Sequence, residues 1–168
     1  MTDRFDVKLT ADDMFRFHMY HTYTSVQGIL SLVVGTLLLA LVLFSDRFSS
    51  AATAVPYGLL AVVMIVSIPI SLRLRAKQQV KASDVLSRTL QFQLREDGIF
   101  VQVQGLEEEA LLPWDGIYKA VTTKHNLLIY SNRVTAYIIP KDQVKEQLPD
   151  IYQALREHCE DYRLQIKN

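Results

Sequence analysis

Charged side chains are missing from two long stretches of this 168-residue chain. Residues 17–45 contain no Asp, Glu, Lys or Arg, and neither do residues 48–72. A helix of about 20 apolar residues crosses the roughly 30 Å hydrocarbon core of a bilayer. Because a backbone in lipid must satisfy its own hydrogen bonds, we predict two transmembrane helices, at about 26–44 and 53–72, joined as an antiparallel hairpin.

Cysteine is almost absent, since Cys159 is the only one. A single cysteine excludes an internal disulfide framework and fits a reducing compartment. Residues 1–25 are polar and precede the first apolar run without the layout of a cleaved signal peptide, so the first helix is expected to stay as an anchor. Residues 82–168 carry ten Lys and Arg against thirteen Asp and Glu. This slightly acidic balance predicts no nucleic-acid partner.

Catalytic and cofactor motifs are also lacking. The chain has no Gly-rich phosphate loop and no Gly-x-Ser-x-Gly sequence, so we predict that it is not an enzyme and holds no cofactor. His18 and His21 lie three residues apart, but a zinc site needs two further ligands, and no metal site is expected. Cys159 and its neighbour His158 point about 100° apart on a helix, which favours core packing of the thiol. The acidic run 107–109 lacks the spacing and glycine turn of a calcium loop and is expected to be a solvated loop or strand edge.

Basic residues flank the two apolar runs and set the expected orientation. Those that follow the second run are Arg73, Arg75, Lys77 and Lys81. The connection between the runs offers only Arg47, offset by Asp46. Because Lys and Arg favour the cytoplasmic side, we predict that both termini are cytoplasmic. The four basic residues after the second run are candidate contacts with anionic lipid.

Small residues recur on one face of each predicted span. On the first span they are Gly28, Ser31 and Gly35, and on the second they are Ala54, Gly58 and Ala61. Small side chains let two helices approach closely in lipid, so these positions predict helix–helix packing within the hairpin. Homo-oligomerisation through the same faces stays open.

The N-terminal region, residues 1–25, combines a strand pattern with a helix pattern. Phe5, Val7 and Leu9 alternate with polar residues, which is typical of a half-buried strand. Thr10 is a good N-cap for a helix over residues 11–23. An isolated strand is unstable, so we expect residues 4–10 to add a seventh strand to a sheet built from residues 88–139.

The C-terminal part, residues 88–168, predicts a small β domain. Six short strands separated by turn residues indicate an antiparallel sandwich or barrel. A helix follows, with an apolar stripe formed by Val144, Leu148, Ile151, Leu155 and Cys159. Pro149 either opens this helix or kinks it. The expected fold is therefore an α+β membrane protein: a hairpin at 26–72, a basic juxtamembrane linker at 73–87, and a domain similar to pleckstrin-homology domains, capped by its C-terminal helix.

Three segments resemble one protein family. They read FQLREDGI at residues 92–99, LPWDGIYK at 112–119 and AYIIPK at 136–141. In these segments and in its layout the chain resembles the YcxB-like bacterial membrane proteins. The resemblance implies a multi-pass protein of the bacterial plasma membrane with a pleckstrin-homology-like domain, and it brings no established catalytic residues.

Two non-catalytic functions remain from the sequence. In one, the β domain is a membrane-tethered interaction or regulatory module for an unidentified protein partner, for example as an immunity or regulatory subunit. In the other, it engages anionic lipid headgroups of the bilayer. The slightly acidic domain favours the first function. Trp114 is of a residue type common at binding hot spots, but its position after Leu112 favours a buried core ring.

Overall fold

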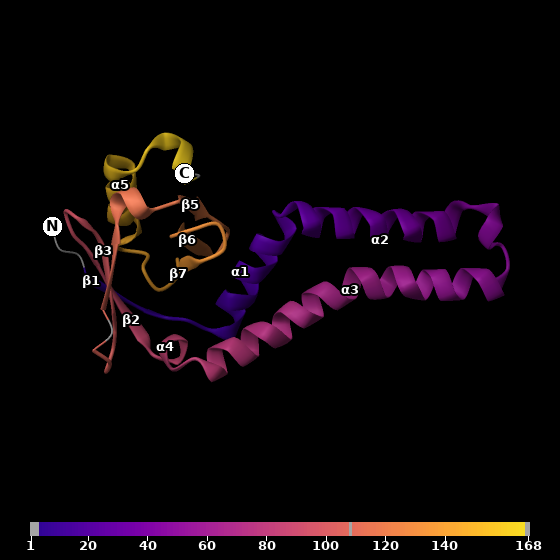
Figure 1. Cartoon of the computed structure of the whole chain (residues 1–168), viewed down its shortest axis with the longest axis horizontal. Coiled ribbons are helices and arrows are strands. Elements are labelled where there is room, and N and C mark those ends of the chain that lie inside the picture. Colours follow the sequence, from indigo (N-terminus) through magenta and orange to yellow (C-terminus); the bar gives the residue numbers. More distant parts are fainter. Residues whose placement is uncertain (1–3, 108, 167–168) are drawn as a thin grey trace. The chain divides into compact units, whose positions relative to one another are not determined.

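A computed structural model describes residues 4–107 and 109–166 (Figure 1). The chain folds as two compact units. One unit joins the N-terminal residues up to Phe17 with the residues from Lys77 onward, and the other is His18–Ala76. The sequence-based division began the β domain at residue 88. The structure also includes the N-terminal strand in that domain, because this strand pairs with a strand that begins at Thr89.

The first unit contains two four-stranded sheets. In spatial order, the first sheet consists of β1 (Arg4–Lys8), β2 (Thr89–Leu94), β3 (Gly98–Val103) and β4 (Glu109–Pro113). The second consists of β7 (Ala136–Pro140), β6 (Asn126–Tyr130), β5 (Lys119–Thr122) and β8 (Leu164–Gln165). The six strands predicted between residues 88 and 139 are all present as β2 to β7. All strand pairs are antiparallel except β5 with β8, which is parallel.

The N-terminal strand joins the β domain as predicted, although it ends at Lys8 and not at Thr10. β1 is antiparallel to β2, with Phe5 opposite Phe92. The rings of this pair stack with centroids 5.3 Å apart. Lys8 is the register partner of Thr89. Residues 9–88 are therefore a long insertion between two neighbouring strands.

The acidic run 107–109 leads into an edge strand. This is one of the two locations that the sequence predicted for it, a solvated loop or a strand edge. Glu107 and Glu109 are exposed, and Glu109 opens β4. Glu108 lies outside the described residues.

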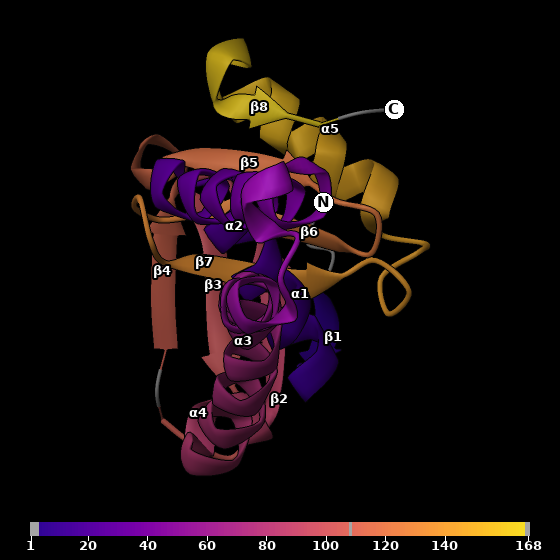
Figure 2. The same ribbon diagram turned by 90° about the vertical axis from the view of Figure 1, so that its right-hand side faces the viewer.

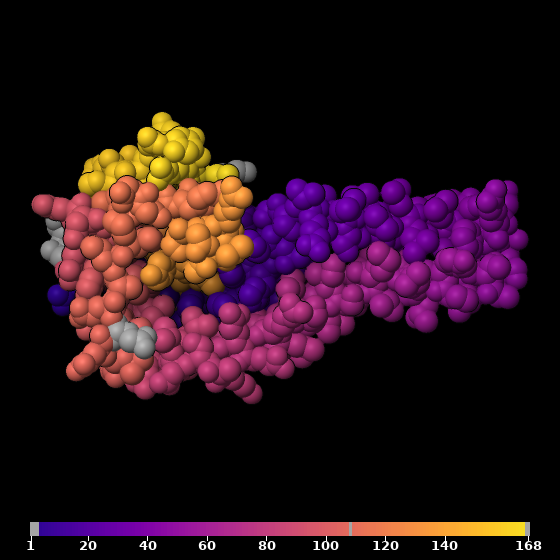
Figure 3. Space-filling model, in the orientation of Figure 1, coloured from indigo at the N-terminus to yellow at the C-terminus, as the bar shows by residue number. Residues whose placement is uncertain are grey.

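The C-terminal helix α5 (Leu148–His158) covers the core of this unit. Four residues of the predicted apolar stripe are buried, namely Val144, Ile151, Leu155 and Cys159, whereas Leu148 is half-buried. Val144 precedes the helix and Cys159 follows it, and within the helix Ile151 and Leu155 have no exposed surface. Pro149 lies in the first turn and opens the helix, which settles the alternative left by the sequence. The 3₁₀ turn η3 (Asp161–Arg163) then leads to β8, beside β5 (Figure 2). In Figure 3 this C-terminal segment, in yellow, lies directly on the orange strands of the same unit.

Helix α1 (Ala11–Tyr23) begins with a capping box. The Asp13 backbone N–H donates to Thr10 Oγ1 at 3.2 Å, and the Thr10 backbone N–H donates to Asp13 Oδ2 at 3.1 Å. Met14 and Phe17 are buried, and the Phe17 ring lies 6.1 Å from that of Tyr130 in β6. The first half of α1 is therefore part of the β domain.

The second unit contains two long apolar helices. They are α2 (Val26–Phe44) and most of α3 (Ala51–Ala82), joined through the 3₁₀ turn η1 (Asp46–Phe48). Both are long and apolar enough to cross a membrane. The structure thus has the α+β composition and the two apolar helices that the sequence predicts.

The expected juxtamembrane linker at residues 73–87 is mostly helical. α3 continues to Ala82, and a short helix, α4 (Asp84–Ser87), follows. The residues of α3 beyond residue 72 include Arg, Lys, Gln, Leu and Ala, all of which have high helix propensity. The helix therefore extends beyond its apolar part, and the basic residues are on a rigid element.

Candidate functional site

The four basic residues after the second apolar run are all exposed on α3. Arg73, Lys77 and Lys81 are four residues apart, so they lie on one face of the helix. Arg75 is displaced from that face by about 200° at 100° per residue. Three of the four predicted lipid contacts thus form a single basic stripe.

The small residues predicted to pack the hairpin have different surroundings. Gly35 is buried, and a Cβ added there would lie 3.0 Å from Ile65 Cγ1 of α3. Ala61 is fully buried, and a Cβ on Gly58 would lie 3.7 Å from Val42 Cγ1 of α2. These three positions lie where the two helices meet.

Gly28 is also buried, but its neighbour is not α3. A Cβ on Gly28 would overlap the backbone carbonyl of Thr22, at the end of α1. Gly28 therefore permits a close approach of the chain at the junction of α1 and α2. Ser31 and Ala54 are half-buried.

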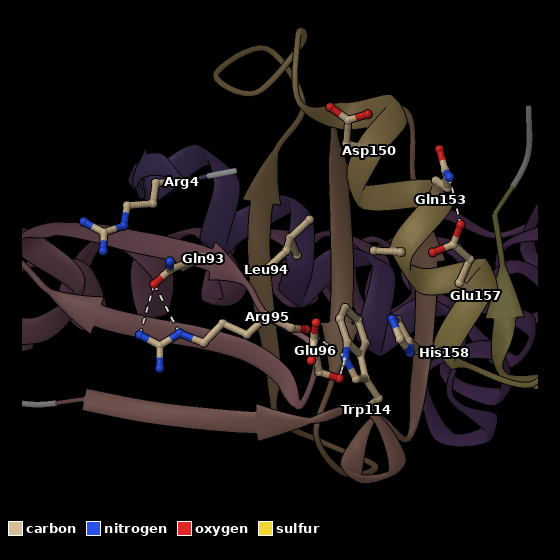
Figure 4. Close-up of a pocket in the computed structure, with 11 residues that line it drawn as sticks. Arg4, Gln93, Leu94, Arg95, Glu96, Trp114, Asp150, Gln153, Glu157 and His158 are labelled. Atoms are coloured by element: carbon tan, nitrogen blue, oxygen red, sulfur yellow. Dashed lines mark hydrogen bonds between the residues drawn. The ribbon is translucent and has the colours of Figure 1, made fainter. Parts of the chain in front are cut away.

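A groove of about 580 Å³ opens in the β domain (Figure 4). Its wall is formed by the start of β1, the end of β2 with the following turn, the 3₁₀ turn η2 (Trp114–Gly116), and one side of α5. The charged residues that line it are Arg4, Arg95, Glu96, Asp150 and Glu157. Four separate parts of the fold thus meet around one concave surface.

Trp114 forms the floor of this groove next to α5. Its side chain is buried, as the sequence predicted, and Nε1 donates to the carbonyl oxygens of Arg95 at 3.1 Å and Glu96 at 3.2 Å. The indole stacks on the His158 ring with centroids 4.6 Å apart and an angle of 13° between the planes. These contacts fix the turn after β2 against the C-terminal end of α5.

The charges of the groove are only partly compensated. Arg95 donates from Nε and Nη2 to Gln93 Oε1, at 3.2 and 3.0 Å, and its guanidinium lies 3.8 Å from the centroid of the Phe100 ring. Glu96 and Asp150 are exposed, and neither side chain has a hydrogen-bond or ion-pair partner within the described residues. The groove therefore offers free carboxylates to a ligand.

Cys159 directly follows α5 and is buried. Its Sγ is 4.0 Å from the Trp114 carbonyl oxygen. Burial raises the pKa of the Cys159 thiol, and the nearby Arg163 charge opposes this only in part. The thiol stays protonated at neutral pH, so its role is the core packing predicted from the sequence. Across residues 4–107 and 109–166, no three His, Cys, Asp or Glu side chains are grouped to hold a metal ion.

Among the groove residues, the sequence pointed to Trp114 as a possible binding residue, and to Gln93–Glu96 only as part of a segment that resembles a family. Arg4, Asp150 and Glu157 are ordinary exposed charges on a strand or a helix, and no pattern marks them. Their common location depends on tertiary packing, which places α5 and the start of β1 around one groove.

Comparison with known proteins gives one family match. No curated protein matches the chain. The family model described as YcxB-like protein matches residues 94–155. This stretch runs from the end of β2 into α5 and contains Arg95, Glu96, Trp114 and Asp150 of the groove. Over residues 94–155, the resemblance to the YcxB-like family that the sequence motifs indicated is confirmed.

Proposed function

We propose that this chain is a non-catalytic interaction module, held in the bacterial plasma membrane by α2 and α3, whose β domain binds another protein. The observation that carries the proposal is the insertion of both apolar helices between β1 and β2. Lys8 and Thr89 are register partners in one sheet. An insertion between two neighbouring strands has to leave and re-enter on the same side of a membrane. Two helices long and apolar enough to cross it, α2 and α3, meet this requirement as a pair.

The basic residues support an orientation for this hairpin. The exposed stripe of Arg73, Lys77 and Lys81 follows the apolar part of α3, whereas the turn between the helices offers Arg47 beside Asp46. By the preference of Lys and Arg for the cytoplasmic side, the β domain and both termini are cytoplasmic.

Thiol labelling on intact cells tests this topology. In a Cys159→Ala background, Ser49→Cys in the turn should react with an impermeant maleimide. Lys124→Cys, in the exposed turn between β5 and β6, should react only after the cells are permeabilised. The reverse pattern would place the β domain outside the cytoplasm, and labelling of both sites on intact cells would reject the hairpin.

The groove favours a protein partner over a lipid surface. Its unpartnered carboxylates, Glu96 and Asp150, would repel anionic headgroups. Residues 82–168 also carry three more acidic than basic side chains, thirteen against ten. A domain already held at the bilayer by two helices gains little affinity for it from a further lipid site.

Lipid engagement is a second candidate function, favoured by the basic stripe on α3. Each exposed Lys or Arg near an anionic leaflet contributes about 1 kcal/mol of attraction at low salt. Replacing Arg73, Lys77 and Lys81 by Gln should then move the β domain away from nanodiscs that contain anionic lipid. Unchanged proximity, measured by energy transfer from Trp114 to a headgroup dye, would remove this candidate.

Site-specific photo-crosslinking in cells tests the protein partner. The full chain is required, because a fragment that begins at residue 88 lacks β1. A photoreactive residue at Gln153, which is exposed in the groove, should give a protein adduct. The same residue at Arg133, which is exposed in the turn between β6 and β7, serves as the control. Equal adducts at both positions, or lipid adducts alone at Gln153, would contradict the proposal.

A further inference from the structure

The outer edge of β1 has backbone groups that point away from its own sheet. In an antiparallel pair, successive residues direct their N–H and C=O groups to opposite sides. The Arg95 backbone N–H donates to the Gly98 carbonyl oxygen at 2.9 Å. The backbone N–H and C=O groups of Arg95, and of every second residue before it in β2, therefore point toward β3. The backbone groups of the intervening residues of β2, among them Leu90 and Phe92, therefore point toward β1.

The register then shows which residues of β1 direct their backbone groups toward β2 and which direct them outward. Val7 pairs with Leu90 and Phe5 with Phe92, so these two residues bond to β2. Arg4, Asp6 and Lys8 direct their N–H and C=O groups to the opposite, outer side.

The contacts of Lys8 agree with this assignment. Its backbone N–H donates to Gln143 Oε1 and its carbonyl oxygen accepts from Gln143 Nε2, both at 2.9 Å. One side-chain amide thus makes the two bonds that a neighbouring strand would make. The outward backbone groups of Arg4 and Asp6 have no such partner among the described residues, and both residues are exposed.

The groove lies at this edge. Arg4 belongs to its lining, and α5 forms the opposite wall with Asp150 and Glu157 (Figure 4). Three carboxylates, including that of Glu96, line the groove against two guanidinium groups, and that of Arg95 is already bonded to Gln93. The edge therefore combines free backbone groups with a surplus of negative charge.

The opposite edge of the same sheet, formed by β4, has fewer free backbone donors and lies away from the groove. Leu111 of β4 also directs its backbone groups outward, because Ile99 and Val101 of β3 face β4 at Leu112 and Ala110. β4 ends at Pro113, which has no N–H to donate, and no described residue of β4 lines the groove. This edge is a matched control for the first.

We propose that the outer edge of β1 accepts a short extended segment of a partner protein as an added strand, and that Lys or Arg side chains of this segment bind the groove carboxylates, those of Glu96 and Asp150. Strand addition uses the free backbone groups of an edge for affinity and neighbouring side-chain sites for specificity. The proposal rests on the proposed function as an interaction module and names the site and the chemical class of its partner.

Selection of displayed peptides tests this site. The probe is a library of random heptapeptides, selected against the full chain in nanodiscs of zwitterionic lipid. Asp6→Pro removes the outward N–H and leaves the bonds of Phe5 and Val7 to β2 in place. Asp6→Ala keeps the N–H and removes the charge, and Leu111→Pro makes the equivalent change on β4.

The proposal expects retained peptides rich in Lys or Arg. Asp6→Pro should bind these peptides at least tenfold more weakly than Asp6→Ala does, whereas Leu111→Pro should bind within about twofold of wild type. Fluorescence of Trp114 reports whether each variant is folded. In the wild type, a saturating selected peptide should also slow amide exchange at Asp6, which keeps the test valid if Asp6→Pro does not fold.

Several outcomes would overturn the proposal: no retained peptide, retained peptides that are acidic, equal binding to Asp6→Pro, or unchanged exchange at Asp6. The proposed function has a separate readout. A protein adduct at Gln153 that persists in Asp6→Pro would keep the interaction module and reject strand addition. Loss of peptide binding together with absence of any adduct would reject both.

Discussion

Shortening Phe5 to Ala measures how much the N-terminal strand stabilises the β domain. The Phe5 side chain is 5% exposed, and its ring is nearly parallel to that of Phe92, with 4° between the planes. Phe92 is 1% exposed and lies on the neighbouring strand. Phe5→Ala therefore removes a buried ring and leaves a cavity beside its partner.

The expected cost follows from this burial. Replacing a buried Phe by Ala costs about 3–5 kcal/mol, of which ring stacking supplies about 0.5–1.5 kcal/mol. Because β1 is an edge strand that can shift into the space, we expect the low end, about 3 kcal/mol. A domain with a total stability of about 5–15 kcal/mol would lose a large fraction of it.

Trp114 provides the assay, since it is the only tryptophan in the chain and it is buried in the β domain. Denaturant unfolding of the full chain, followed by Trp114 fluorescence, reports this unit and not the apolar helices. Asp6→Ala, an exposed neighbour on the same strand, is the control and should change the free energy of unfolding by less than about 0.5 kcal/mol. The reasoning fails if Phe5→Ala destabilises the domain no more than Asp6→Ala does.

Three further changes can be followed by the same fluorescence midpoint. Gln143→Ala removes both hydrogen bonds to the Lys8 backbone and should lower the free energy of unfolding by about 1–2 kcal/mol, with faster amide exchange at Lys8. An unchanged exchange rate at Lys8 would show that these bonds do not hold the end of β1. Stability should fall as the pH rises above the ordinary thiol pKa of 9.0, because the unfolded Cys159 ionises there while burial raises the pKa of the folded thiol. Below that pH both states hold the proton. Tyr137, whose pKa burial also raises above 10.0, adds a second fall at higher pH. Cys159→Ala should abolish the first fall only; a fall that persists in this variant would refute the assignment. Gly98→Ala places a Cβ on the Leu112 carbonyl oxygen, at a backbone φ of +157°, and should cost about 1–3 kcal/mol; a wild-type midpoint would show that the turn relaxes freely.

The strands of the β domain could be predicted because their side chains alternate. Leu90, Phe92 and Leu94 are all buried in β2, and Phe5 and Val7 are buried in β1. The alternation also predicted that β1 needs a partner, since a lone strand cannot bury one face. The pairing to β2 in particular depends on the register, which no single segment specifies.

Three other features of the fold had weak sequence signals or none. The two-residue strand β8 forms only because the chain after α5 passes beside β5. The extension of α3 to Ala82 was readable in the helix-forming residues beyond residue 72, but the loss of apolar character suggested a linker. The pairing of Gln143 with Lys8 joins residues 135 positions apart, and nothing in either local sequence indicates it.

Amide exchange along β1 tests most directly the claim that the apolar hairpin is inserted within a folded domain. With the full chain in nanodiscs, the amides of Phe5 and Val7 should exchange slowly, because they bond to β2. The amide of Asp6 between them should exchange fast, because it points outward. This alternation is the predicted result. Fast exchange at all three residues would show that β1 is not part of the sheet and would contradict the account.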